Sequence, residues 1–113
     1  MTVLAIVDDL FFRAKIEAAA AQMGAALKVA TDADGGPWRL IIIDLNLSTR
    51  DPVELVKTIR TTAPSTPIVG YYSHVQVDLE TRAKHAGCSM VLPRSAFVKQ
   101  LPALLQMPDG LTA

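Results

Sequence analysis

The sequence predicts an α/β domain built around a parallel β-sheet. Short aliphatic runs recur along the chain, and most intervals between them show the spacing of an amphipathic helix. This alternation is typical of a parallel sheet with crossover helices. With 113 residues, 50% of them hydrophobic, the chain is long enough for one domain with a sizeable core.

Five segments are expected to form the strands. Each is short and rich in aliphatic side chains, and the third, LIII, has no polar residue, as in a strand buried on both faces. The segments are residues 3–7, 26–30, 40–43, 67–72 and 89–92.

The first expected helix follows the first strand. Phe12, Ile16, Ala19 and Met23 share one stripe of this helix, and Gly24 is expected to end it.

The later helices are recognised by their ends. Asp51 suits the N-cap of the second helix and Pro52 its first position. A third helix is expected to carry Val75, Leu79, Arg82 or Ala83, and Ala86, and to end at Gly87. A last helix is expected to begin at a Ser95 N-cap, and Pro102 should kink or interrupt it.

One connection lacks a helical pattern. Residues 31–38, TDADGGPW, combine Gly, Pro and Asp in a way that cannot easily supply a crossover helix. We therefore expect the helix between the second and third strands to be short or absent, with Trp38 packed over the sheet. Apolar surface left uncovered there could form an interface.

The charge pattern excludes several classes of protein. Eleven basic residues balance eleven acidic ones without a basic run, which argues against binding to nucleic acid or to a membrane surface. The single cysteine, Cys88, excludes an internal disulfide. The first apolar run is too short for a signal peptide or a membrane span, so we expect a cytoplasmic protein.

Polar side chains follow four of the expected strands. Asp8 and Asp9 follow the first strand, Asp44 the third, Ser73 the fourth and Arg94 the fifth. Ligands of open parallel sheets bind beyond the carboxyl ends of the strands, so a functional site is expected at this edge. Since burial of an unpaired charge is costly, Asp44 is a solvated turn residue, a cap, or a member of a site that compensates its charge.

Four segments, in this order, resemble the receiver domain of two-component response regulators. They are LAIVDDLFFRAKI, IIIDLNLSTRDPVELVKTIR, PSTPIVGYYS and AGCSMVLPRSAF. The resemblance implies a flavodoxin-like strand order, 2-1-3-4-5, with helices on both faces of the sheet. It implies a receiver domain over residues 1–107, and residues 108–113 are expected to form a C-terminal tail.

The resemblance also implies a Mg²⁺-dependent phosphorylation site. A histidine kinase or phosphotransfer protein would donate the phosphoryl group, and an unidentified protein partner would receive the signal. The domain would not be an enzyme beyond its own phosphorylation and dephosphorylation. The implied roles are phosphoacceptor for Asp44, phosphoryl contacts for Ser73 and Arg94, and metal ligation by Asp8, Asp9, Asp44 and the backbone carbonyl of Asn46.

Repulsion between the clustered carboxylates is a physical reason to expect a Mg²⁺ ion. Two carboxylates about 4 Å apart repel by about 4 kcal/mol at an effective dielectric constant near 20. Mg²⁺ binds carboxylates, waters and phosphate oxygens, so it would offset this repulsion.

The chain departs from the receiver pattern at several positions. Arg94 replaces a lysine, Val91 replaces an aromatic residue that many receivers use as a rotor, and His74 stands beside Ser73 where its ring could narrow access to Asp44. Around the phosphoacceptor loop, Pro52 and Ser48 replace the usual glycine and proline of receivers. Ser95 replaces a proline that often follows the lysine. These departures favour an atypical stand-alone receiver. A pseudo-receiver, which binds a partner without phosphorylation, is the competing hypothesis.

Several of these residues also have a structural interpretation. Asp9 could cap the first helix, Ser73 could form a capping box with Gln76, and Arg94 could be a solvated loop cation. An aspartyl phosphatase is disfavoured because Asn46 stands where its second carboxylate would be needed. A nucleotide-binding domain is disfavoured because no glycine-rich turn follows the first strand.

Overall fold

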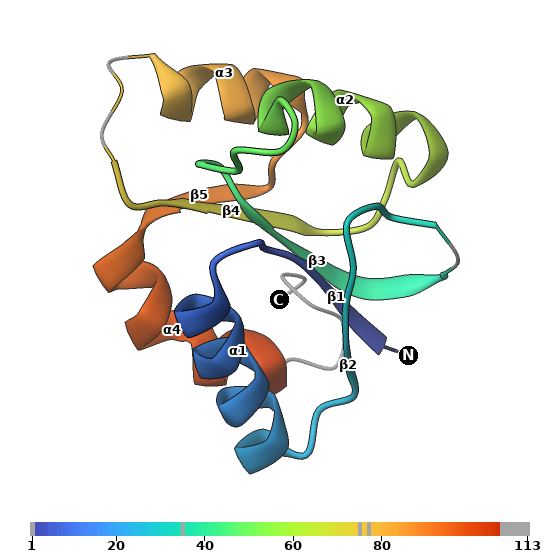
Figure 1. Ribbon diagram of the computed structural model, residues 1–113. Coiled ribbons are helices and arrows are strands. Elements are labelled where there is room, and N and C mark those ends of the chain that lie inside the picture. Colours follow the sequence, from blue (N-terminus) through green and yellow to red (C-terminus); the bar gives the residue numbers. More distant parts are fainter. Residues whose placement is uncertain (1, 35, 75, 77, 107–113) are drawn as a thin grey trace.

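The fold is a five-stranded parallel sheet in the order β2-β1-β3-β4-β5 (Figure 1). The computed structural model describes residues 2–34, 36–74, 76 and 78–106. The predicted fold class and strand order are both confirmed. The elements in chain order are β1 (Thr2–Ile6), α1 (Leu10–Met23), β2 (Leu27–Val29), β3 (Trp38–Asp44), α2 (Pro52–Thr62), β4 (Ile68–Tyr72), α3 (Leu79–Ala86), β5 (Met90–Pro93) and α4 (Arg94–Gln106).

Helices cover both faces of the sheet. Figure 1 shows α1 and α4 side by side on one face and α2 and α3 on the other. Alternate residues of β3 supply the two cores, since Leu40 and Ile42 belong to the core beneath α1 and α4, and Ile41 and Ile43 to the core beneath α2 and α3. The central position of β3 explains why its sequence is a continuous apolar run.

Most helix ends lie where the sequence predicts them. Gly24 ends α1 in the left-handed conformation, with φ of 68°, and Gly87 follows α3. Asp51 caps α2 by accepting the backbone N–H groups of Val53 at 3.0 Å and Glu54 at 3.3 Å.

The α3 and α4 helices differ from the prediction at their starts. The α3 helix begins at Leu79, and Val75, which was expected to belong to it, lies outside the described residues. The α4 helix begins at Arg94 directly after β5, so Ser95 is a helical residue and not an N-cap. The helix also continues through Pro102, because the buried leucines around this position hold it against the sheet. The predicted tail, residues 108–113, lies outside the described residues.

The described residues between β2 and β3 form no helix, as predicted. The indole N–H of Trp38 donates to the carbonyl of Ala33 at 3.2 Å, and the Trp38 side chain packs against the core beneath α2 and α3. Arg50 holds the same segment by donating to the carbonyl of Thr31 at 3.0 Å and pairing with Asp32 at 3.6 Å. A cavity of about 180 Å³ remains between this segment and α2. That this surface is an interface stays a prediction.

In the described ranges, every helix is too short or too polar to cross a membrane.

Candidate functional site

Asp44 is a buried carboxylate at the carboxyl end of the central strand. Its exposed fraction is 6%, and no other charged residue among those described is buried to this degree. Burial raises the pKa of Asp44 above its usual value, whereas the backbone N–H of Asn46, which donates to Oδ1 at 2.8 Å, lowers it. The charges of Asp8 and Asp9 raise the pKa further, and Arg94 lowers it. These three side chains therefore lie within electrostatic reach of Asp44.

The other two carboxylates have hydrogen-bond partners of their own. Asp9 is the N-cap of α1, and its Oδ1 accepts the backbone N–H groups of Phe11 at 2.9 Å and Phe12 at 3.2 Å. Asp8 Oδ2 accepts from Ser48, from the hydroxyl at 3.2 Å and from the backbone N–H at 3.4 Å. The cap considered for Asp9 is present, and the contact between Asp8 and Ser48 was not expected from the sequence.

The acidic residues have the donor chemistry of a magnesium site, but their side chains do not converge on one point. Within the part of the chain that the structure describes, no three His, Cys, Asp or Glu side chains are placed to hold a metal ion together. Carboxylates are the ligands that Mg²⁺ prefers, and Asp8 and Asp9 lie close enough to Asp44 to change its pKa. Ser48 would compete with the ion for Oδ2 of Asp8.

The side chain of Asn46 joins the loops that follow β3 and β4. Its Oδ1 accepts the backbone N–H of Ser73 at 2.6 Å and that of His74 at 3.1 Å. The resemblance to receiver domains implied a role only for the backbone carbonyl of Asn46. The sequence signal for a role of the side chain is its position just beyond a strand end, where asparagine side chains often bind neighbouring backbone groups. Because α3 begins at Leu79, the capping box considered for Ser73 is not formed.

Arg94 stands at the start of α4 and contacts an aromatic ring of α1. Its guanidinium carbon lies 4.7 Å from the centroid of the Phe12 ring, a distance typical of a cation–π contact. The same charge lowers the pKa of Asp44. Arg94 is therefore an exposed helical residue that contacts Phe12 and influences Asp44, and its role at the site stays a prediction.

Three aromatic rings pack beside the site on the face covered by α1 and α4. Tyr71 lies between Phe12 and Phe97, with ring centroids 4.6 Å from each, and Phe12 and Phe97 are 5.8 Å apart. We call these three residues the aromatic cluster. Val91 of β5 is buried on the other face and belongs to the core beneath α2 and α3. The cluster joins residues that are distant in sequence, which is why periodicity did not indicate it.

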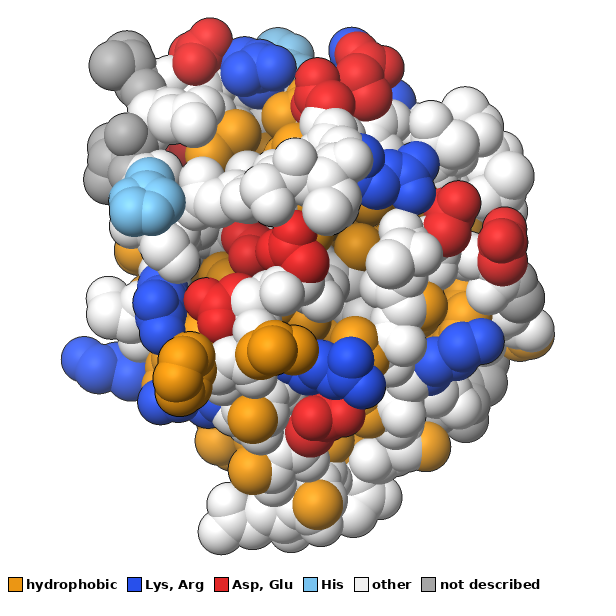
Figure 2. All heavy atoms as spheres, viewed as in Figure 1, with side chains coloured by type: hydrophobic (Ala, Val, Ile, Leu, Met, Phe, Trp, Pro, Cys, Tyr) orange, Lys and Arg blue, Asp and Glu red, His pale blue; other side chains and the backbone are white. Residues whose placement is uncertain are grey.

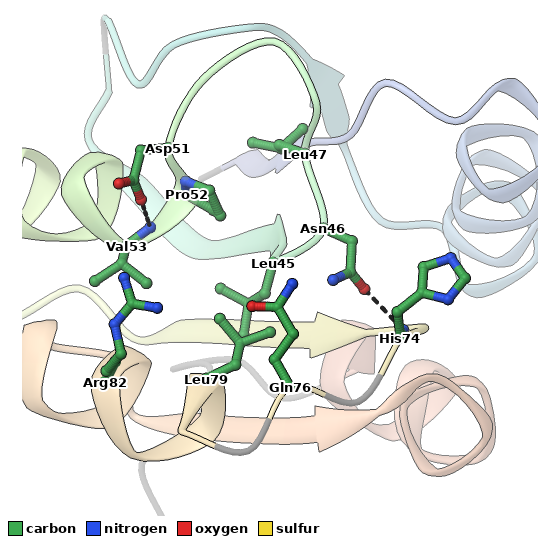
Figure 3. Close-up of a pocket in the computed structure, with 10 residues that line it drawn as sticks. All are labelled: Leu45, Asn46, Leu47, Asp51, Pro52, Val53, His74, Gln76, Leu79 and Arg82. Carbon is green, nitrogen blue, oxygen red and sulfur yellow. Dashed lines mark hydrogen bonds between the residues drawn. The ribbon is translucent and has the colours of Figure 1, made fainter.

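A cleft of about 500 Å³ opens beside the site (Figure 3). Asn46 and Leu47 line it from the loop after β3, and Arg82 lines it from α3. His74 also lines this cleft, and Figure 3 shows the contact of its backbone with Asn46. The suggestion that His74 narrows access to Asp44 stays a prediction.

Large apolar side chains are exposed next to the acidic edge. Leu10 and Phe11, the first residues of α1, are 76% and 87% exposed. Figure 2 shows acidic side chains gathered near the centre of the visible face, with hydrophobic and basic side chains beside them. This edge therefore offers both charge and apolar contact area.

Comparison with solved structures identifies the fold as that of response regulator receiver domains. The chain is similar to a response regulator protein from Burkholderia pseudomallei, solved with a phosphorylated aspartic acid, a calcium ion and citrate, at 20% identity and a TM-score of 0.79. That match covers 94% of this chain and 66% of the other, so this chain spans about two thirds of its length.

Two further structures match nearly the whole of this chain. The chemotaxis protein CheY4 of Vibrio cholerae is 23% identical with a TM-score of 0.80, over 93% of this chain and 95% of that one. The phosphorylated cyanobacterial phytochrome response regulator RcpA is 19% identical with a TM-score of 0.76, over 93% and 88%. No known family profile and no curated protein matches the sequence.

Proposed function

We propose that this chain is a receiver domain that accepts a phosphoryl group on Asp44 and signals through a protein partner. The donor would be the phosphohistidine of a histidine kinase or phosphotransfer protein. The observation that carries the proposal is the burial of Asp44 at the end of the central strand, with Asp8, Asp9 and Arg94 within electrostatic reach. The receiver fold supports it, as does the phosphorylated aspartic acid in the Burkholderia protein.

The proposed reaction moves a phosphoryl group from nitrogen to oxygen. A carboxylate oxygen of Asp44 forms the new P–O bond as the P–N bond of the donor breaks, and the bonding electron pair stays with the imidazole. Arg94 would offset the negative charge on the equatorial oxygens, and the Ser73 hydroxyl would donate to one of them. Mg²⁺ bound by Asp8 and Asp9 would supply further charge neutralisation.

The product is an acyl phosphate whose added charge can be recognised by a partner. Attack of water on phosphorus would break the bond between phosphorus and the Asp44 oxygen. This reaction restores the carboxylate of Asp44 and releases inorganic phosphate. We propose no enzymatic activity beyond these reactions of the domain on itself.

A pseudo-receiver is the second candidate, and two contacts favour it. Asp8 accepts a hydrogen bond from Ser48, and Arg94 lies over the ring of Phe12. Two residues of the proposed site therefore have partners other than a metal or a phosphoryl group. This function predicts that Asp44→Asn leaves partner binding unchanged and that titration with Mg²⁺ gives no saturable signal.

Intact mass spectrometry after incubation with acetyl phosphate and Mg²⁺ tests the proposal. The wild type and Asp34→Ala, which removes an exposed carboxylate away from the site, should each gain one phosphoryl group. Asp44→Ala should gain none. The proposal is wrong if the wild type is unmodified or if Asp44→Ala is modified to the same extent.

A further inference from the structure

Tyr71 carries a buried hydroxyl group that has no hydrogen-bond partner. The residue is 1% exposed, and this oxygen is the buried side-chain polar atom without a partner in the described ranges. A buried hydroxyl without a partner destabilises a protein relative to a phenyl ring of the same shape. Phenylalanine would preserve the packing, because Phe12 and Phe97 occupy the same cluster. Packing alone therefore does not explain the hydroxyl.

The Tyr71 side chain shares a face of the sheet with the candidate phosphoacceptor. Tyr71 of β4 is paired in register with Asp44 of β3, so both side chains lie on the face covered by α1 and α4. After burial, the charge of Asp44 is the largest influence that raises the pKa of Tyr71. Asp9 also raises it and Arg94 lowers it, so the phenol lies within the field of the acidic edge.

The Tyr71 ring is held in a defined position. It lies 4.6 Å from the ring of Phe12 in α1 and stacks at 15° on the ring of Phe97 in α4. A donor fixed by packing loses little rotational freedom when it gains an acceptor, which favours binding. The hydroxyl is thus a preorganised donor that lacks an acceptor in the unphosphorylated protein.

We propose that Tyr71 is a phosphoryl-binding residue, whose hydroxyl donates a hydrogen bond to a phosphoryl oxygen carried by Asp44. Phosphorylation extends the Asp44 side chain and adds three strong acceptor oxygens beside Tyr71. A neutral donor bound to a charged acceptor forms one of the stronger hydrogen bonds in proteins. The inference rests on the proposed phosphorylation of Asp44, and Tyr71 would join Ser73 and Arg94 as a third contact.

The test compares Tyr71→Phe with Tyr72→Phe in the full chain. Tyr72 is the matched control, because it is the next residue of β4 and packs on the opposite face of the sheet. The probe is beryllium trifluoride with Mg²⁺, a stable analogue of the phosphoryl group. Fluorine NMR measures both its affinity and the chemical shift of each bound fluorine atom.

We expect Tyr71→Phe to weaken binding of the probe by about tenfold. One fluorine resonance should also shift, because one fluorine atom loses a donor. Tyr72→Phe should leave the affinity and the spectrum unchanged. Wild-type affinity and an unchanged spectrum in Tyr71→Phe would overturn the inference alone. A wild type that neither binds the probe nor reacts with acetyl phosphate would overturn the proposed function and this inference together.

A second measurement does not depend on the folding of Tyr71→Phe. The near-ultraviolet tyrosine absorbance of the wild type should change when the probe binds, and Tyr72→Phe should keep that change. If probe binding leaves the tyrosine absorbance unaltered, the hydroxyl of Tyr71 has gained no charged acceptor and the inference is wrong.

Discussion

The side-chain oxygen of Asn46 lies 2.6 Å from the backbone nitrogen of Ser73, and this hydrogen bond joins the loops that follow β3 and β4. The backbone N–H of Asn46 meanwhile donates to Asp44. One residue thus connects the candidate phosphoacceptor to the strand exit that carries the candidate hydroxyl contact.

Asn46→Ala should lower the free energy of unfolding by about 1 kcal/mol, because two backbone N–H groups lose their side-chain acceptor. The amides of Ser73 and His74 should also exchange faster with solvent. Urea denaturation and hydrogen exchange measure these effects. Asn46→Asp is the control, since its carboxylate still accepts both bonds. Equal amide exchange in the wild type and Asn46→Ala would contradict the role of this side chain.

Tyr71→Phe should raise the free energy of unfolding by about 1 kcal/mol, since it removes an unpaired buried hydroxyl and preserves the ring. Most core substitutions have the opposite sign. Denaturation in urea without Mg²⁺ provides the measurement, with Tyr72→Phe as the control. A clear loss of stability in Tyr71→Phe would mean that its hydroxyl has a partner in the unphosphorylated protein.

Asp44→Asn should stabilise the protein by an amount that grows with pH. Burial raises the pKa of Asp44 above its usual value of 3.8, so the folded state keeps this proton at pH values where the unfolded chain has lost it. The contribution of Asp44 to stability therefore falls as the pH rises from about 3.8 through the folded pKa. Urea denaturation of both proteins at several pH values, without divalent cations, measures the difference. A difference that is constant with pH would contradict the prediction.

Ser48→Ala should increase the affinity for Mg²⁺ by roughly threefold, because the Ser48 hydroxyl no longer competes with the ion for Asp8. The effect is small because this hydrogen bond is long and exposed, at 3.2 Å. Titration with Mg²⁺ measures the affinity, and Thr49→Ala in the same loop is the control. Weaker binding in Ser48→Ala would show that Ser48 instead orients Asp8 for the metal.

Arg94→Ala should slow phosphorylation by acetyl phosphate by about tenfold or more, because the charge that offsets the equatorial oxygens is lost. Arg94→Lys should keep more activity, since an ammonium group supplies the charge without the guanidinium geometry. The rate of phosphoryl gain is read by intact mass, with Lys99→Ala as an α4 control. Equal rates for the wild type and Arg94→Ala would exclude Arg94 from the reaction.

Local patterns predicted most of the elements because their causes lie within a few residues of one another. The Asp51 and Pro52 start of α2 and the Gly24 end of α1 lie where they were predicted. The start of α4 was wrong, because the chain passes from β5 into a helix without an intervening cap. A serine that matches a capping pattern does not by itself show that a turn with an N-cap precedes the helix.

The sequence by itself determined the α/β class, the lack of a helix among the described residues between β2 and β3, and the set of polar residues at the strand ends. Periodicity and strand exits are local properties. Only the tertiary structure decided which of these side chains have other partners. In the structure Ser48 donates to Asp8, and Tyr71, whose buried hydroxyl has no partner, pairs in register with Asp44. These relationships depend on strand order and register, which bring together residues that are far apart in the chain.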